Sequence, residues 1–293
     1  MDGAIIADKP AGMTSHDVVN RLRRLSGTRK IGHLGTLDPM ATGVLPLLIG
    51  RATRLAQFFA PAEKQYAARI RFGWATDTYD AEGTPLSDPV EPNFSRAELE
   101  TALARFRGAF LQTPPPFSAM KIAGTPAYKL ARKKMPVELT PVEVRVLALH
   151  LDEFDGSSAR IRVHCSAGTY VRGIAHDLGQ QLGSGAFLES LRRTASGDFT
   201  EEQALPLADL ANLSEAGHLA DALIPAARLL PQFSSAAVDL LTVGQIRQGK
   251  DFRLSPFLAA PASKYVKAIS QQGDLVAIGE ARLPYLYHPI LVL

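Results

Sequence analysis

The chain has 293 residues, of which 46% are hydrophobic and 21% charged, with a net charge of only +3. Cys165 is its one cysteine, which excludes an intrachain disulfide and a thiolate zinc site. The sequence shows neither a leader pattern nor an apolar run near the ~18 residues of a membrane helix, so we expect a cytoplasmic protein. At ~150 residues per domain, the length favours one large domain and one smaller domain.

The first elements are a strand and a helix. Apolar residues over Gly3–Asp8 predict a short strand that stops at Lys9-Pro10. Thr14 or Ser15 is placed to cap a helix that ends near Gly27. Its buried face is predicted by apolar residues at helical spacing, namely Val18, Val19, Leu22 and Leu25.

A glycine-punctuated loop follows, from Gly32 to Pro46, with one imidazole at His33 and one carboxylate at Asp38. The loop leads into an apolar run, so Asp38 is expected near a core where water is scarce. A carboxylate in such a place is a candidate nucleophile or general base. The alternative is that Asp38-Pro39 only starts a turn and His33 lies on the surface.

Beyond a short predicted helix over Thr53–Phe59, the pattern changes to period two. Tyr66 shares one strand face with Ala68, Ile70 and Phe72, so it is expected to point inward. A polar turn over Asp77–Gly83 follows. The capping box Ser95–Glu98 then predicts a helix to about Arg107, with Leu99, Leu103 and Phe106 buried.

The segment Thr113–Pro141 is a proline-rich excursion, long enough to indicate a functional or disordered loop. This segment carries one cluster of basic residues, and a second cluster lies just before and within the Asp38 loop. Two such clusters on a nearly neutral chain favour local basic patches over general surface charge, whereas a single cluster would indicate a solvated helix face. The loop residues are Lys121, Lys129, Arg132, Lys133 and Lys134, and the earlier ones are Arg21, Arg23, Arg24, Arg29, Lys30 and His33.

Strands are predicted around Val142–Leu149 and Ala159–Cys165, and a helix over Val171–Leu182. Strands and helices alternate without regular βαβ spacing, which favours an α+β fold with a mixed, mainly antiparallel sheet flanked by helices. From about Asp209 the chain becomes a helical connector, and short strands resume after Phe233. We therefore expect domains at residues 1–230 and 231–293.

Polar groups from four segments could meet: Asp38, Tyr66, the pair Tyr170 and Arg172, and Leu191–Arg193. A carboxylate in an apolar cleft needs a nearby guanidinium to stay ionised, and Arg172 at a helix start is the natural candidate. A surface salt bridge is the alternative for Arg172. The sequence lacks the motifs of metal sites, phosphate-binding loops, dinucleotide-binding folds and Ser-His-Asp hydrolases. It also lacks the second acid that a glycosidase needs.

The same segments resemble the bacterial tRNA pseudouridine-55 synthases of the TruB type. The resemblance runs in order from about residue 3 to residue 230. It is carried by Asp8–Val19, Lys30–Pro46, Lys64–Tyr66, Thr76–Asp80, Gln112–Pro115, Ser118–Lys121, Tyr128–Arg132, Cys165–Arg172, Asp177–Gly179 and Leu191–Thr194.

The resemblance implies a pseudouridine-synthase fold with a small, β-rich, PUA-like C-terminal domain, and isomerisation of uridine 55 in the T arm of tRNA. Asp38 would be the nucleophile and Arg172 its ion-pair partner. Tyr66 would stack on the base and could help remove the C5 proton. Tyr170 and Leu191 would line the uridine pocket, His33 would enter the T loop as the base flips out, and residues 113–141 would insert into RNA. An isomerisation needs no cofactor.

Leu34 departs from the resemblance, because the family usually has a small polar residue there. The sequence is compatible with attack of Asp38 on C1′, attack on C6, or proton abstraction from the ribose. A tRNA-binding folding chaperone with incidental catalysis and a synthase for ribosomal RNA are the alternative functions. The expected partner is tRNA, with no membrane, no obligate protein partner and a monomeric state.

Overall fold

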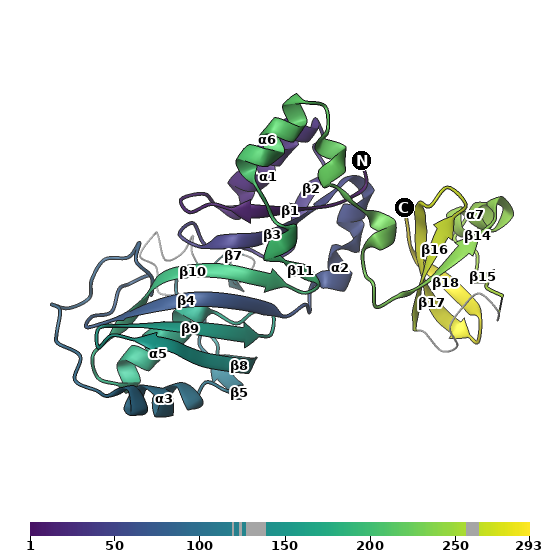
Figure 1. The fold of residues 1–293 in the computed structure, drawn as a ribbon. Coiled ribbons are helices and arrows are strands. Elements are labelled where there is room, and N and C mark those ends of the chain that lie inside the picture. Colours follow the sequence, from purple (N-terminus) through teal and green to yellow (C-terminus); the bar gives the residue numbers. More distant parts are fainter. Residues whose placement is uncertain (119, 123–124, 127–138, 256–263) are drawn as a thin grey trace.

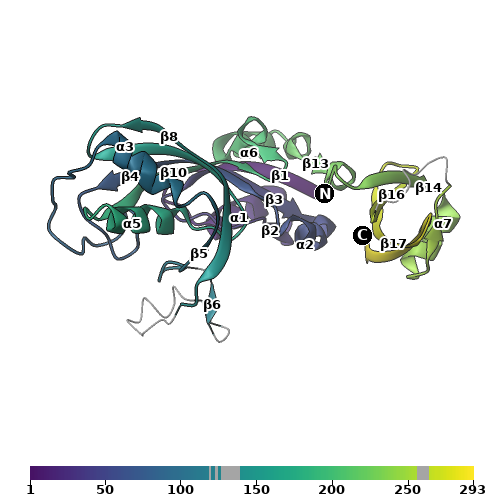
Figure 2. The same ribbon diagram turned by 90° about the horizontal axis from the view of Figure 1, so that it is seen from below.

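The computed structural model describes every residue except 119, 123–124, 127–138 and 256–263 (Figure 1). Its described strands form one sheet of eleven strands, one of five and a two-stranded ribbon. Helices cover one face of the large sheet, and both termini lie at the junction between the large sheet and the five-stranded sheet (Figures 1 and 2).

The large sheet is mixed and mainly antiparallel, which confirms the predicted α+β class. Its main path runs β12-β1-β3-β10-β4-β9-β8-β5, with β13 on β1, β2 on β3 and β11 on β10. Within this sheet, the described strand pairs that run parallel are β1–β12 and β10–β3. The strands are β1 (Gly3–Lys9), β2 (Ile31–His33), β3 (Thr42–Ile49), β4 (Lys64–Phe72), β5 (Gly108–Gln112), β8 (Val142–Phe154), β9 (Ser158–Cys165), β10 (Ala186–Ser196), β11 (Phe199–Thr200), β12 (Leu205–Pro206) and β13 (Ile224–Pro225).

Four helices supply apolar residues to the main core on one face of this sheet. They are α1 (Ser15–Ser26), α3 (Arg96–Ala104), α5 (Val171–Gln181) and α6 (Leu207–Glu215). In α1 the fully buried Val18 and Leu22 contribute, and in α5 Ile174 and Leu178 do. Ser95 and Glu98 form the predicted capping box, and Thr14, one of the two predicted caps, forms a further capping box with Asp17.

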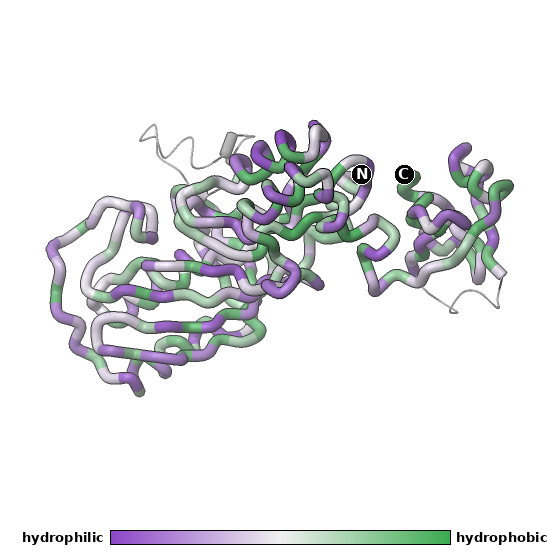
Figure 3. The backbone as a smooth tube through the Cα atoms, turned by 45° about the horizontal axis from the view of Figure 1, so that its top comes forward, coloured by the Kyte–Doolittle hydropathy of each residue, from purple (hydrophilic) through white to green (hydrophobic). Residues whose placement is uncertain are grey.

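The opposite face of the sheet is covered only in part. Behind β1 and β3 lies a second core, which includes Leu55, Phe59 and residues of the small sheet, so β3 is apolar on both faces. Behind β4, β9 and β10 the face is open, and cross-strand ion pairs such as Arg69–Glu189 and Arg162–Asp152 occupy it. These strands therefore alternate between hydrophobic and hydrophilic residues (Figure 3).

The five-stranded sheet has the order β14-β16-β17-β18-β15 and is joined to α7 (Leu240–Arg247). Buried Lys267 links it to the preceding segment, donating hydrogen bonds to the carbonyls of Ala227 (3.1 Å) and Leu229 (2.9 Å). No helix in the described part of the chain is long and apolar enough to cross a bilayer. The strands are β14 (Ser234–Val238), β15 (Phe252–Arg253), β16 (Tyr265–Ser270), β17 (Leu275–Leu283) and β18 (Leu286–Val292).

Two helix predictions need correction. The helix expected over Thr53–Phe59 begins earlier, as a 3-10 turn at Gly50–Leu55, and only Ala56–Phe59 is α-helical (α2). The helix expected to reach Arg107 ends at Ala104, and tighter turns continue it to Arg107, after which Gly108 (φ +82°) begins β5. In both cases short i→i+3 turns extend the helical pattern at an end, which residue spacing does not distinguish from α-helix.

Of the Thr113–Pro141 excursion, the structure describes both ends and a short ribbon of β6 (Lys121–Ile122) and β7 (Thr125–Pro126). The ribbon projects away from the large sheet (Figure 2). Lys129, Arg132, Lys133 and Lys134 lie outside the described residues.

Candidate active site

Asp38 and Arg172 come from segments 134 residues apart and meet on the helix-covered face of the large sheet. The Arg172 Nη2 donates a hydrogen bond to Asp38 Oδ1 at 3.1 Å, and Nε lies 2.9 Å from Oδ2. The Arg172 side chain is 5% exposed and that of Asp38 is 32% exposed. The guanidinium is thus almost fully enclosed, while the carboxylate keeps an open side.

Arg172 has a second carboxylate partner, Asp80, whose Oδ2 lies 3.3 Å from Nη1. Two carbonyls complete the environment: Nη1 donates to Thr78 O at 3.0 Å and Nη2 to Phe117 O at 3.1 Å. Asp80 is itself buried, with Oδ1 accepting from the Thr78 hydroxyl and the Glu82 amide. The guanidinium therefore connects three loops and is fixed in direction.

The pKa of Asp38 is raised above its ordinary value of 3.8. Loss of water on burial is the largest cause, and the negative charge of Asp80 adds to it. The charge and hydrogen bond of Arg172, and the charge of Lys9, act in the opposite direction. Asp38 is consequently a more basic carboxylate than one on the surface.

Buried polar side chains hold the backbone on either side of Asp38. The Lys9 ammonium, at the end of β1, donates to the carbonyls of Pro10 (2.8 Å), Pro39 (3.0 Å) and Ala41 (2.7 Å). Burial lowers the pKa of Lys9 to about 8, although the charge of Asp38 opposes this change. Ser15, at the start of α1, uses its hydroxyl to accept from Leu37 N (2.8 Å) and to donate to Leu37 O (3.1 Å).

Arg193, at 1% exposure, supports the same loop from β10. Its Nε donates to Val44 O at 2.7 Å and its Nη2 to Gly35 O at 3.1 Å. Gly43 has φ +99° and pairs with Arg193, and a Cβ there would lie 2.3 Å from the Arg193 carbonyl. Position 43 therefore requires glycine.

Tyr66 and His33 both lie beside Arg193. Tyr66 faces the main core as predicted, and it pairs with Arg193 across β4 and β10. Burial raises the Tyr66 pKa, although the charge and hydrogen bond of Arg193 oppose that rise. His33 is half-buried at the end of β2, its Nδ1 has no partner, and burial together with Arg193 lowers its pKa.

Tyr170 and Leu191 lie on elements that also carry site residues. Tyr170 precedes α5, and the buried Gln112 side chain bonds both its amide and its carbonyl at 2.9 Å. Burial raises the pKa of the Tyr170 hydroxyl, and a hydrogen bond with Ser118 and the charge of Arg172 oppose that rise. Leu191 is 7% exposed on β10, where it faces the main core.

The sequence analysis grouped Asp38, Arg172, Tyr66 and Tyr170 with Leu191–Arg193, but it gave Arg193 no role and did not single out the other supporting residues. Asp80 and Gln112 lie in segments that carry the family resemblance. Residue type alone, however, does not show that Asp80 holds Arg172 or that Gln112 holds Tyr170. Lys9 and Arg193 bond mainly to backbone carbonyls, which leave no mark on sequence. Lysine and arginine that the fold buries completely are rare enough to indicate function once burial is known.

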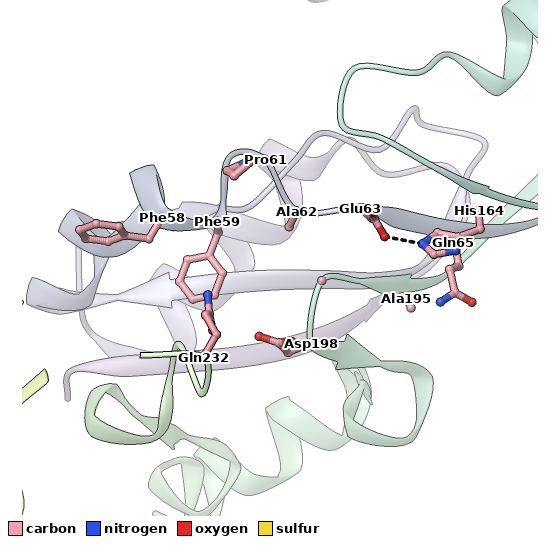
Figure 4. Close-up of a pocket in the computed structure, with 11 residues that line it drawn as sticks. Phe58, Phe59, Pro61, Ala62, Glu63, Gln65, His164, Ala195, Asp198 and Gln232 are labelled. Carbon is pink, nitrogen blue, oxygen red and sulfur yellow. Dashed lines mark hydrogen bonds and ion pairs between the residues drawn. The ribbon is translucent and has the colours of Figure 1, made fainter. Parts of the chain in front are cut away.

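The described residues hold no cluster of three or more histidine, cysteine, aspartate or glutamate side chains suited to a metal. A cavity of about 410 Å³ opens on the other face of the sheet, with Phe58, Phe59, Gln65 and Asp198 on its walls (Figure 4). A hydrogen bond between Glu63 and His164 (2.8 Å) lies at this cavity, and neither Asp38 nor Arg172 lines it.

Comparison with known proteins gives consistent matches. Residues 23–171 match the model of the TruB family pseudouridylate synthase N-terminal domain, and residues 172–231 match the tRNA pseudouridylate synthase B C-terminal domain. The tRNA pseudouridine synthase B of Solibacter usitatus is 58% identical over 293 residues, covering 100% of both chains. The protein of the same description from Chromobacterium violaceum is 40% identical, covering 100% of this chain and 95% of its own.

Solved structures give the same fold. A chain in the structure of an H/ACA RNP bound to a substrate RNA containing 2′-deoxyuridine has a TM-score of 0.72 at 25% identity, covering 99% of this chain and 84% of its own. A chain of a Cbf5-Nop10-Gar1 complex has a TM-score of 0.71 at 28% identity, covering 97% and 79%. The predicted fold family is therefore confirmed, and the curled five-stranded sheet fits a PUA-like domain.

Ser15→Ala tests how much the Asp38 loop depends on its buried hydroxyl. The variant leaves the amide and carbonyl of Leu37 without their partner, and unpaired buried groups cost about 1–3 kcal/mol each. We expect a thermal midpoint lower by roughly 2–10 °C and faster amide exchange at Leu37. Ser26→Ala is the control on the same helix, because Ser26 bonds only within its own turn and to Thr28. Equal midpoints and equal Leu37 exchange in both variants would contradict the assignment.

Proposed function

The chain belongs to the TruB family of pseudouridylate synthases, and we propose that it isomerises the uridine at position 55 in the T arm of tRNA. Full-length similarity to proteins described as tRNA pseudouridine synthase B supports tRNA as the substrate. Two basic segments on a nearly neutral chain support a polyanionic partner. We expect the enzyme to act as a monomer in the cytoplasm.

The observation that carries the proposal is the pairing of Asp38 with Arg172. We assign Asp38 as the nucleophile, because its carboxylate is the group of this pair that keeps an exposed side. Arg172 keeps that carboxylate ionised against the cost of burial and fixes its direction. A protein that only bound RNA would gain nothing from a desolvated acid facing phosphates.

The reaction breaks the N1–C1′ bond of uridine, turns the uracil, forms a C5–C1′ bond and moves one proton from C5 to N1. The three reacting atoms are out of reach while the base is stacked, so the nucleotide must flip out at a cost of a few kcal/mol. A loose uracil must also be kept from water and from escape. The product keeps every atom of the uridine, so the reaction itself requires no co-substrate and no cofactor.

The remaining residues are assigned to holding the flipped base. Tyr66, on β4 opposite Arg193, would stack on the uracil, with its hydroxyl near C5 for proton removal. Tyr170 and Leu191 would form the walls of the uridine pocket. His33, with an unpaired Nδ1 at the end of β2, would enter the T loop in place of the flipped base. The segment 113–141 starts at the site, since Phe117 O bonds Arg172, and would extend along the RNA.

Asp38→Asn tests the nucleophile. The amide has nearly the same shape but cannot act as a nucleophile, and Arg172 keeps Asp80 as a counter-charge. We expect no pseudouridine formation on a tRNA transcript, with affinity for that transcript within about tenfold of the unchanged protein, roughly 1.4 kcal/mol.

The control Asp152→Asn removes a carboxylate on the open sheet face, and its activity should be unchanged. A transcript with cytidine at position 55 shows whether the product comes from that position. Full turnover by Asp38→Asn would end the assignment, and undiminished product from the altered transcript would end the choice of position 55.

The raised pKa of Asp38 predicts the pH dependence. A nucleophilic carboxylate must be ionised, so kcat/KM should fall as the pH is lowered through the pKa of Asp38, above 3.8. Because the charge of Asp80 raises that pKa, Asp80→Asn should move the acid limb to lower pH, whatever its effect on the maximal rate. Activity that stays constant down to pH 4 would contradict the predicted pKa of Asp38.

Neutralising Lys133 and Lys134 tests the inserting loop. Log affinity falls linearly with log salt concentration, and each lost phosphate contact should make this fall less steep, by about 0.7–0.9 in slope. We expect weaker tRNA binding in the double glutamine variant, with a flatter salt dependence. Arg160→Gln with Arg162→Gln removes two charges from the open sheet face as a control. Equal slopes in the loop variant and the unchanged protein would remove the loop from the interface.

A further inference from the structure

One face of α5 contacts the turn at residues 78–80 through two side chains. Arg172 and His176 are four residues apart, so they project from the same face of the helix on successive turns. Arg172 bonds Thr78 O and Asp80, as described above. The His176 imidazole stacks on the ring of Tyr79, with centroids 3.7 Å apart and planes 11° from parallel.

Tyr79 has a strained backbone at this point. Its φ is +67°, a region that residues with a side chain seldom occupy and that persists only when the surroundings enforce it. Tyr79 O accepts from Leu188 N at 3.0 Å, and Ala81 N donates to Leu188 O at 3.0 Å, so β10 holds the turn from one side. The stack with His176 holds it from the side of α5.

His176 contacts Tyr79 through the face of its ring and not through a hydrogen bond. Its Nδ1 is buried and has no hydrogen-bond partner, and burial lowers its pKa, so the neutral ring is favoured. An unpaired buried nitrogen destabilises a fold. The contribution of His176 is therefore the flat face that it places against Tyr79.

We propose that His176 and Tyr79 are positioning residues for Arg172: their stacked rings hold the strained turn so that Thr78 O and Asp80 aim the guanidinium at Asp38. This inference rests on the proposed function, because Asp38 must be the reacting group for the aim of Arg172 to matter. Asp80 and Thr78 flank Tyr79 directly, so a shift of the Tyr79 backbone moves both partners of Nη1. Small errors in the placement of reacting groups cost large factors in rate.

Paired substitutions separate ring stacking from the other properties of these residues. His176→Ala and Tyr79→Ala remove one ring each, while His176→Phe and Tyr79→Phe keep a flat ring and remove the polar atoms. Each variant is tested with a tRNA transcript for single-turnover rate, KM and thermal midpoint. The double variant His176→Ala with Tyr79→Ala measures whether the two effects are coupled.

We expect each alanine variant to lower the single-turnover rate about tenfold with KM changed less than about twofold, because substrate contacts are untouched. The phenylalanine variants should keep at least half of the original rate. The double alanine variant should be no slower than the slower single variant, since one stack is lost in all three. A lower rate at an unchanged midpoint would be an effect that a merely structural contact does not produce.

Three results would overturn the proposal: alanine variants with the original rate, phenylalanine variants as slow as alanine variants, or fully multiplicative effects in the double variant. Tyr79→Gly covers the case of an unfolded alanine variant, because glycine accepts φ +67° without strain. It should be as slow as Tyr79→Ala, and a rate equal to that of the unchanged protein would show that the ring has no role. Inactivity of the unchanged protein on every transcript would contradict the proposed function instead.

Discussion

The site depends on one guanidinium shared between two carboxylates. Arg172 lies within 3.3 Å of both Asp38 and Asp80, and its remaining hydrogen bonds go to backbone carbonyls. The three side chains carry a net charge of −1 in a place mostly closed to water. A lone carboxylate there would cost several kcal/mol and would take up a proton instead. The planar fork of arginine satisfies both acids from fixed directions, which a lysine ammonium would not do.

The loop around Asp38 has little regular structure, so side chains have to satisfy its buried backbone groups. Lys9, Ser15 and Arg193 do this from β1, α1 and β10, three elements that the main core already fixes. The two buried cations also place positive charge around the loop, which offsets the acids inside it. Rigidity and electrostatic balance therefore come from the same residues. A loop held this way can keep its shape when a ligand binds against it.

Much of this arrangement could be predicted from the sequence, for reasons that are local. The alternation in β4 and the capping boxes at Thr14 and Ser95 are patterns between near neighbours. Strand β10 was missed because register shifts after Leu188 and Arg193 break its period of two. In β3, Pro46 argues against a central strand, but it lies where neither β2 nor β10 pairs with β3. The contacts of Lys9 and Arg193 with carbonyls, and the stack of His176 on Tyr79, exist only in three dimensions.

The unequal exposure of the central pair fits a reaction in which the substrate completes the site. Arg172 is 5% exposed and already in a protein environment, whereas Asp38 keeps 32% of its side-chain surface open. A base that entered against Asp38 would remove the remaining water from the carboxylate and leave its counter-charge unmoved. The attraction between the two charges would then strengthen as the local dielectric falls, at the moment when the acid must stay ionised. A pair buried equally on both sides would be as stable, but its carboxylate could not reach a substrate.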